Sequence, residues 1–282
     1  MSVKITYSKQ AISKFSINLV LFCNDKFNIS SLKKYLTISE HSYISDLLKS
    51  NDLKKNLLVF EVNSKKRIII ISVKNDLKSS DIENLGAEFY GKVNYGKNSE
   101  YILNSDSVVG KNENFIGHFL HGFKLKSYEF KKYKTKKDTR IITLNISGSK
   151  NKPSSLNQLK FKALEEGTFY ARDLVSEPGN VLHPDEYAKR LNSLRKDGLK
   201  INIYDQKKLK KLGMNALLGV GMGSIRGSYL VTMEWNGLSK KTKPLAFVGK
   251  GVCFDTGGIS LKPAKFMEDM TYDMAGSAVV VG

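Results

Sequence analysis

Residues 245–282 read LAFVGKGVCFDTGGISLKPAKFMEDMTYDMAGSAVVVG, and this stretch decides the fold expected for the second half of the chain. It opens with an apolar run, Leu245–Val248, that has the length and content of a buried strand. A lysine between two glycines, Lys250, comes next, and a second short apolar run leads to Asp255. Paired glycines then allow a sharp turn. We therefore expect a buried strand whose end and following turn display charged side chains.

Four charged residues lie at the strand ends and turns of this stretch: Lys250, Asp255, Lys262 and Asp273. A charged residue beside glycine is usually a solvated turn residue. Here, however, Lys250 and Asp255 are bracketed by apolar neighbours such as Val252. A charge drawn into apolar surroundings needs an opposite charge or a metal ion. These four residues are therefore the candidate functional residues.

This stretch resembles the leucyl (cytosol) aminopeptidase family in two segments, Lys250-Gly-Val-Cys-Phe-Asp255-Thr-Gly-Gly-Ile-Ser-Leu-Lys262 and Met270-Thr-Tyr-Asp273-Met-Ala-Gly. Weaker similarity extends back over residues 171–180. Members of the family are two-metal exopeptidases with a C-terminal catalytic domain. The resemblance implies a metal-dependent aminopeptidase, a hydrolase that releases N-terminal amino acids from peptides with a leucine-type preference.

The resemblance also implies roles for individual residues. Lys250, Asp255 and Asp273 would hold two divalent ions, Mn²⁺ or Zn²⁺, with Lys250 binding through a neutral amine. Because free lysine has a pKa of about 10.4, the amine loses its proton only where a bound cation offsets that cost. The ions would supply a deprotonated water and polarise the peptide carbonyl. Lys262 would stay cationic and stabilise the oxyanion, and Met270 would line the pocket for the first side chain.

The chain departs from the family at its C-terminal end. Family members continue into an Asp-x-Glu-Gly-Arg-type motif, which carries two more metal ligands and an arginine that holds a carbonate base. Residues 1–282 contain no such motif, and the last residues form an apolar run that a helix would need partners to bury. We therefore expect a truncated catalytic domain with weak metal binding and little activity by itself. The family forms hexamers, so we expect a homo-hexamer for the complete protein.

Composition indicates a globular protein, with 41% hydrophobic and 10% aromatic residues. No run approaches the ~18 apolar residues of a membrane span, and the N-terminus lacks the pattern of a secretory signal. The two cysteines, Cys23 and Cys253, lack metal-ligand spacing, so we expect both to be reduced thiols in a core. The expected compartment is the cytoplasm.

The formal net charge of +19 favours an anionic partner when it is considered alone. Its densest cluster, residues 124–137, interleaves lysines with aromatic residues, as single-strand binders do. Lysine dominates over arginine, which disfavours bidentate recognition of bases or phosphates. We favour a solvated surface. The alternatives are a non-catalytic nucleic-acid-binding protein or accessory DNA binding by an aminopeptidase.

Helical and strand patterns alternate along the chain and predict an α/β fold in two parts. The first is a small N-terminal α/β domain over residues 1–150, and the second, over residues 151–282, is the first part of a mainly parallel catalytic α/β domain. A polar stretch with glycine and proline, residues 148–155, marks the boundary. The clearest patterns are strands at 57–62, 67–73, 141–146, 200–204 and 229–235, and helices at 114–123 and 156–174.

Three other motifs give weaker signals. Gly219-Val-Gly-Met-Gly-Ser224 lacks the third glycine of a dinucleotide loop and follows a helical pattern, so a tight turn is favoured. His118 and His121 share a helix face, but no carboxylate pattern completes a metal site, and ordinary core or surface histidines are favoured. The Asp255-Thr-Gly sequence is shared with aspartic proteases. Those enzymes are all-β and need two carboxylates that share a proton, which basic neighbours oppose.

Overall fold

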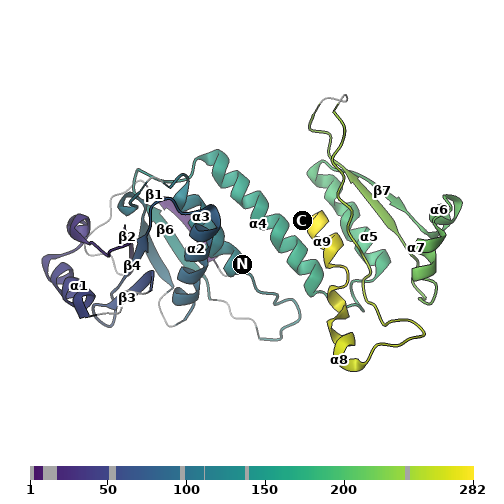
Figure 1. Ribbon diagram of the computed structural model, residues 1–282, viewed down its shortest axis with the longest axis horizontal. Coiled ribbons are helices and arrows are strands. Elements are labelled where there is room, and N and C mark those ends of the chain that lie inside the picture. Colours follow the sequence, from purple (N-terminus) through teal and green to yellow (C-terminus); the bar gives the residue numbers. More distant parts are fainter. Residues whose placement is uncertain are drawn as a thin grey trace. The chain divides into compact units, whose positions relative to one another are not determined.

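The chain divides into two compact units, Met1–Glu165 and Glu166–Gly282. The computed structural model describes residues 3–8, 18–50, 55–95, 99–110, 112–136, 140–238 and 242–282 (Figure 1). The long amphipathic helix expected at 156–174 is confirmed as α4 (Ser155–Ser176), and it carries the chain from the first unit into the second. The sequence predicts a domain boundary near residue 150, before α4 begins. The two compact units instead divide between Glu165 and Glu166, within α4.

A six-stranded sheet forms the centre of the first unit, in the order β1-β6-β5-β2-β4-β3. Its strands are β1 (Val3–Ser8), β2 (Asn18–Asn24), β3 (Leu57–Glu61), β4 (Arg67–Val73), β5 (Glu100–Asn104) and β6 (Ile142–Ser147). In the described part of the chain all neighbouring strands are parallel except β3 and β4, which form an antiparallel hairpin. The strands predicted at 57–62, 67–73 and 141–146 and the α/β class are therefore confirmed, and the mostly parallel sheet lies in this first unit.

Helices cover both faces of this sheet (Figure 1). Ile69 and Ile71 of β4 pack in the core that contains α2 (Ser79–Val93) and α3 (Phe115–Lys126). Ile68 and Ile70 of the same strand pack in the opposite core with α1 (Ile38–Ser50) and the short 3₁₀ helix η1 (Ser30–Lys34). Burial on both faces explains why the sequence of β4 is continuously apolar instead of alternating. A second 3₁₀ helix, η2 (Ser105–Ser107), follows β5.

The two histidines of α3 contact carboxylates that sequence spacing does not reveal. His118 Nδ1 lies 2.9 Å from Glu83 Oε1, and His121 Nδ1 lies 3.3 Å from Glu165 Oε1. Both rings lie 5.1 Å from the ring of Phe161. In the described residues, no group of three or more His, Cys, Asp and Glu could hold a metal ion. Ordinary core or surface histidines therefore remain a prediction for these two positions.

The second unit contains two strands and several short helices. Strands β7 (Lys200–Tyr204) and β8 (Leu230–Glu234) pair antiparallel. The parallel sheet expected for this half is therefore not found among its described residues, and the parallel strands described lie in the first unit. The helices after α4 are α5 (Pro184–Asn192), α6 (Gln206–Lys211), α7 (Asn215–Val220), α8 (Ala264–Met267) and α9 (Ala275–Val281), with 3₁₀ helices η3 (Ser193–Asp197) and η4 (Glu268–Tyr272). The buried core consists of Leu174, Leu182, Tyr187, Leu191, Cys253, Met274 and Ala278.

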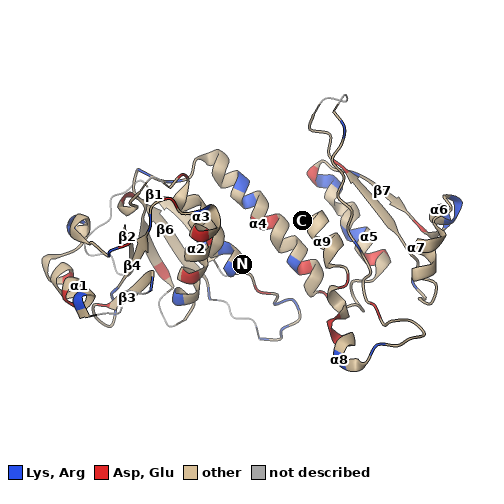
Figure 2. Ribbon diagram, viewed as in Figure 1, with Lys and Arg blue, Asp and Glu red and all other residues tan. Residues whose placement is uncertain are grey.

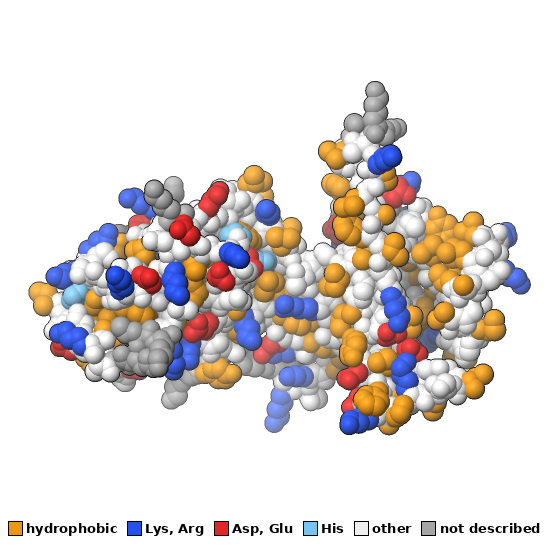
Figure 3. Space-filling model, viewed as in Figure 1, with side chains coloured by type: hydrophobic (Ala, Val, Ile, Leu, Met, Phe, Trp, Pro, Cys, Tyr) orange, Lys and Arg blue, Asp and Glu red, His pale blue; other side chains and the backbone are white. Residues whose placement is uncertain are grey.

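The buried strand predicted at Leu245–Val248 is wrong. These residues form no strand, and the side chains of Leu245, Phe247 and Val248 are 81%, 71% and 96% exposed. In the described residues β7 and β8 pair only with each other, so no strand lies beside this run. Without a neighbouring strand, an extended segment makes no ladder hydrogen bonds. Hydrophobic side chains are also visible on the surface of the second unit in Figure 3.

Charged side chains are distributed over the helices of both units (Figure 2). Two lysines of the basic cluster pair with carboxylates: Lys124 with Glu165 at 3.1 Å, and Lys131 with Glu129. Cys23 and Cys253 are both buried free thiols, as predicted. None of the helices described is both long and apolar enough to cross a membrane.

Candidate active site

Lys250 lies in a segment that runs against the start of α9. The Ser277 N–H donates a hydrogen bond to the Lys250 carbonyl oxygen at 2.9 Å. A Cβ atom on Gly249 would stand 2.5 Å from Ser277 Cα and 2.7 Å from the Gly276 carbonyl oxygen. Only glycine permits this backbone approach. The glycine that precedes the lysine is therefore required by packing against α9.

Asp273, between η4 and α9, forms an ion pair with Lys250. Lys250 Nζ lies 2.7 Å from Asp273 Oδ1, and the side chains are 59% and 18% exposed, respectively. The hydrogen bond to Asp273 raises the pKa of Lys250, so the amine is an ammonium in this arrangement. The other carboxylate oxygen, Asp273 Oδ2, is buried and has no hydrogen-bond partner among the described residues.

A tight loop brings Asp255 and Lys262 together. The Gly257 N–H donates to Asp255 Oδ1 at 2.8 Å, and the Lys262 N–H donates to the Thr256 carbonyl at 2.9 Å. Gly257 has a φ of +90°, and a Cβ there would stand 2.4 Å from the Ser260 carbonyl oxygen. The loop places Lys262 Nζ 2.6 Å from Asp255 Oδ2. That hydrogen bond, followed by the one from Gly257, lowers the pKa of the Asp255 carboxyl.

The four charged residues thus form two ion pairs, Lys250 with Asp273 and Lys262 with Asp255. The charge of Asp255 contributes to the raised pKa of Lys250, and the charge of Lys250 contributes to the lowered pKa of Asp255. The fifth predicted residue, Met270, lies in η4, where its carbonyl accepts a hydrogen bond from the Asp273 N–H at 3.3 Å. Its side chain is half-buried. The structure therefore joins the four charged residues in two pairs and places Met270 in the turn before Asp273.

The side chains present fit part of a divalent-metal site. Asp255 and Asp273 supply carboxylate oxygens, and the buried Oδ2 of Asp273 is an acceptor that a cation would satisfy. The Lys250 nitrogen can bind a metal only after it loses its proton. In the described ranges no third carboxylate, histidine or cysteine joins the two aspartates in a metal-binding group. The described residues alone therefore do not form a complete metal site.

Two residues that sequence analysis does not single out support this arrangement. Ser277 Oγ lies 3.0 Å from the hydroxyl of Tyr187 and donates to the Met274 carbonyl at 2.8 Å. Tyr187 belongs to α5 and is 5% exposed, and burial raises its pKa to about 12. Ser277 stands out only as a hydroxyl within the small-residue run 275–278. Its partner is 90 positions away in sequence, so local spacing cannot reveal the contact.

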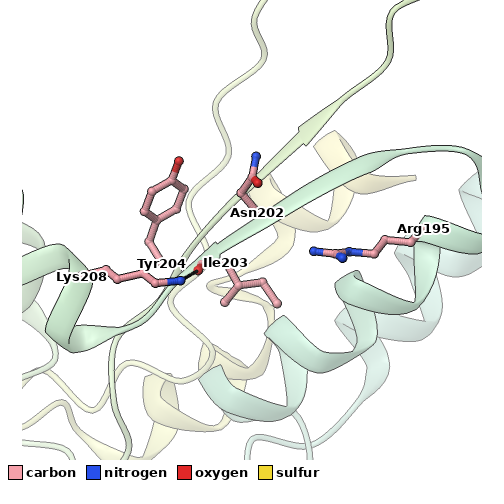
Figure 4. Close-up of a pocket in the computed structure, with 5 residues that line it drawn as sticks. All are labelled: Arg195, Asn202, Ile203, Tyr204 and Lys208. Carbon is pink, nitrogen blue, oxygen red and sulfur yellow. Dashed lines mark hydrogen bonds between the residues drawn. The ribbon is translucent and has the colours of Figure 1, made fainter.

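A hollow of about 400 Å³ lies elsewhere in the second unit (Figure 4). Lys208 Nζ donates to the Ile203 carbonyl at 3.2 Å, and Arg195 donates to the Ile201 carbonyl. None of the predicted functional residues lines this hollow, so it does not belong to the candidate active site. Its lining residues are Arg195, Asn202, Ile203, Tyr204 and Lys208.

Comparison with known sequences identifies close relatives of the chain. Residues 169–282 match the model of the cytosol aminopeptidase family, catalytic domain. A probable cytosol aminopeptidase of Nitrobacter winogradskyi is 38% identical over 282 residues, which cover 94% of this chain and 55% of that protein. One of Chelativorans sp. is 50% identical over 166 residues, which cover 57% and 34%. The chain therefore spans about half the length, or less, of these curated relatives.

Solved structures share the fold. The crystal structure of cytosol aminopeptidase from Coxiella burnetii matches with a TM-score of 0.73 at 20% identity, over 97% of this chain and 55% of that chain. The bottromycin maturation enzyme BotP, in complex with Mn, matches with a TM-score of 0.69 at 20% identity, over 93% and 54%. The resemblance seen in the sequence is thus confirmed: residues 169–282 match the catalytic-domain model of the cytosol aminopeptidase family, and nearly the whole chain is similar to the first part of probable cytosol aminopeptidases.

Proposed function

We propose that the chain is part of a metal-dependent aminopeptidase that releases N-terminal amino acids from peptides, with a leucine-type preference. The observation that carries this proposal is the pairing of Lys250 with Asp273 and of Lys262 with Asp255. These residues lie within the segment that matches the family's catalytic domain.

We assign Lys250, Asp255 and Asp273 to the binding of two divalent ions. Mn²⁺ is favoured over Zn²⁺ because the similar enzyme BotP is described in complex with Mn. When bound, such ions supply an activated water and polarise the scissile carbonyl. The lowered pKa of Asp255 keeps its carboxylate ionised, as a metal ligand must be. The exposed side chain of Lys250 can release its proton directly to solvent.

Lys262 and Met270 act on the substrate in this proposal. Lys262 is held beside Asp255 by the loop of residues 256–262, which fixes a positive charge next to the assigned metal ligands. A fixed charge of this kind stabilises the negative oxygen that develops on the attacked carbonyl. Met270, half-buried in η4, offers an apolar surface to the first side chain of the peptide.

Further expectations concern the whole protein. The chain spans 55% of the length of its Nitrobacter winogradskyi relative, so we expect it to hydrolyse little or no peptide by itself. From the resemblance we expect a homo-hexamer that acts in the cytoplasm. The ion pairs of Lys124 and Lys131 reduce the charge that the basic cluster offers to nucleic acid, so the nucleic-acid alternative gains no support.

Titration of the chain with Mn²⁺ by isothermal calorimetry tests the metal assignment. Asp273→Asn and Lys250→Ala should each weaken Mn²⁺ binding about tenfold or more, because each removes an assigned ligand. Asp269→Asn is the matched control, since it makes the same charge change at an exposed position of η4 and should leave the affinity unchanged. Equal Mn²⁺ affinity for Asp273→Asn and the unmodified chain would refute the assignment.

Hydrolysis of leucine p-nitroanilide tests the chemistry, in a protein that also carries the remaining length of its relatives. Lys262→Ala should lower kcat about 100-fold or more, as the loss of one oxyanion-stabilising group does. Because Lys262 is not an assigned ligand, Mn²⁺ should still bind. Full turnover by this variant would remove the role proposed for Lys262.

A further inference from the structure

A short chain of hydrogen bonds leads from α5 to Lys250. Ser277 Oγ donates its only proton to the Met274 carbonyl, so the Tyr187 hydroxyl is the donor in the 3.0 Å contact between Tyr187 and Ser277. The Ser277 N–H in turn donates to the Lys250 carbonyl. One residue, Ser277, therefore connects the buried tyrosine to the backbone of Lys250.

Ser277 makes hydrogen bonds to the backbone on both sides of the Lys250–Asp273 ion pair. It bonds the backbone of Lys250 directly, and it bonds the carbonyl of Met274, the residue that follows Asp273. The segments are packed closely, because a Cβ on Gly249 would stand 2.5 Å from Ser277 Cα and one on Gly251 would stand 3.3 Å from Ser277 Oγ. Ser277 therefore contacts the backbone of Lys250 and that of the residue next to Asp273.

Tyr187 is a rigid anchor for this contact. Its ring belongs to the core of the second unit together with Cys253 and Met274, and only 5% of the residue is exposed. Tyr170 packs against the same core, but its buried hydroxyl has no hydrogen-bond partner among the described residues. Both tyrosines thus pack at the core of the second unit, but of the two only Tyr187 forms a hydrogen bond with Ser277 in the part of the chain described.

We infer that Tyr187 and Ser277 are positioning residues of the metal site proposed above: they set the position of Lys250 relative to Asp273 without contact to metal or substrate. The claim that these contacts serve a metal site rests on the proposed function. The geometry itself rests only on contacts within the second unit.

Amide hydrogen exchange at residue 277, measured by NMR on the metal-free chain, tests the geometry. Tyr187→Phe and Ser277→Ala each remove one hydroxyl and leave the backbone N–H in place. Both should speed exchange of this amide about five- to tenfold, the effect of losing one ordinary hydrogen bond. Ser277→Thr, which keeps the hydroxyl, and Tyr170→Phe should exchange at the rate of the unmodified chain. Unchanged exchange in both Tyr187→Phe and Ser277→Ala would overturn the inference.

The Mn²⁺ affinity of the same variants tests whether the two hydroxyls support the metal site. Tyr187→Phe and Ser277→Ala should bind Mn²⁺ about tenfold more weakly, as loss of a supporting contact does at metal sites. Ser277→Thr should restore the affinity, and Tyr170→Phe should not change it. Faster exchange with undiminished Mn²⁺ binding would show a purely structural role and overturn the inference. If the unmodified chain bound no Mn²⁺, that result would contradict the proposed function. The amide exchange rates of the variants would still show whether the two hydroxyls hold the backbone of Lys250 in place.

Discussion

Replacement of Gly249 by alanine should destabilise the second unit by crowding the start of α9. The added Cβ would stand 2.5 Å from Ser277 Cα and 2.7 Å from the Gly276 carbonyl oxygen. Because unstrained contacts between carbon atoms are about 3.5–4.0 Å, the two segments must separate by about 1 Å. That separation also breaks or lengthens the 2.9 Å hydrogen bond from Ser277 N–H to the Lys250 carbonyl.

The two effects add to a measurable loss of stability. Overpacking of this kind costs about 1–3 kcal/mol, and a lost hydrogen bond costs about 0.5–1.5 kcal/mol. We therefore expect Gly249→Ala to lower the free energy of unfolding of the second unit by about 2–4 kcal/mol. Urea unfolding can be followed through the fluorescence of Trp235, which is the one tryptophan of the sequence and lies in this unit. The urea midpoint should fall by about 1–2 M.

Gly219→Ala is the matched control for this measurement. Gly219 lies in α7 of the same unit, and nothing lies within 4 Å of the position of its added Cβ among the contacts described. Alanine is the better helix former by about 0.5–1 kcal/mol, so this variant should unfold at the same or a higher urea concentration. A Gly249→Ala midpoint equal to that of the unmodified chain would refute the argument from close packing.

Three further outcomes follow from the described contacts. Lys262→Met should lower the urea midpoint of the second unit near neutral pH, because Lys262 holds the pKa of the Asp255 carboxyl below its usual value of about 3.9. This difference should shrink below that pH and vanish once the pH falls through the lowered pKa. Glu165→Gln should lower the stability of the first unit by about 1–2 kcal/mol in thermal melts followed by circular dichroism, since it weakens two buried charge-assisted bonds. Burial raises the pKa of Cys23 to about 12 and of Cys253 to about 11, so neither native thiol should react with Ellman's reagent within minutes at mildly alkaline pH.

Each of these outcomes has its own control. Lys265→Met is the control for Lys262→Met, because the Lys265 ammonium lies over the ring of Phe266. Its urea midpoint should show no pH-dependent difference that follows the charge of Asp255. Glu88→Gln removes an exposed carboxylate from the same unit as Glu165 and should leave the melting temperature unchanged. Both thiols should react once the chain is unfolded in guanidinium chloride. A Lys262→Met difference that persists unchanged in acid would contradict the assigned ion pair.

The sequence singles out the charged residues of the candidate active site, but it does not specify how they pair. The sequence predicts that Lys250, Asp255 and Asp273 converge, and it assigns Lys262 a separate role at the substrate. The structure places Lys262 against Asp255 because the loop between them turns back through Gly257 at positive φ. That return depends on the conformation of the loop, which residue spacing does not specify.

Strong local signals account for several other elements of the structure. Pro184 occupies the first turn of α5, where its missing N–H has no cost, and His183 precedes it as the N-cap. The apolar pattern of α4 and the hairpin of β3 and β4 are likewise properties of neighbouring residues. The direction of pairing between β7 and β8 is not local, since it depends on residues about thirty positions apart, such as Ile203 and Val231.

The failure at Leu245–Val248 has the same physical origin. The run is apolar and extended, and sequence can specify that much, but strand formation requires a second backbone at hydrogen-bonding distance. In the described residues no such backbone lies beside it, and an extended segment in water can satisfy its peptide groups with solvent. Immediately afterwards, the chain does find a partner, because Gly249 lets the backbone reach α9 and Lys250 accepts a hydrogen bond from Ser277. The same extended chain is therefore exposed at Val248 and docked at Lys250, and the difference lies in the availability of a partner backbone, not in the hydrophobicity of the residues.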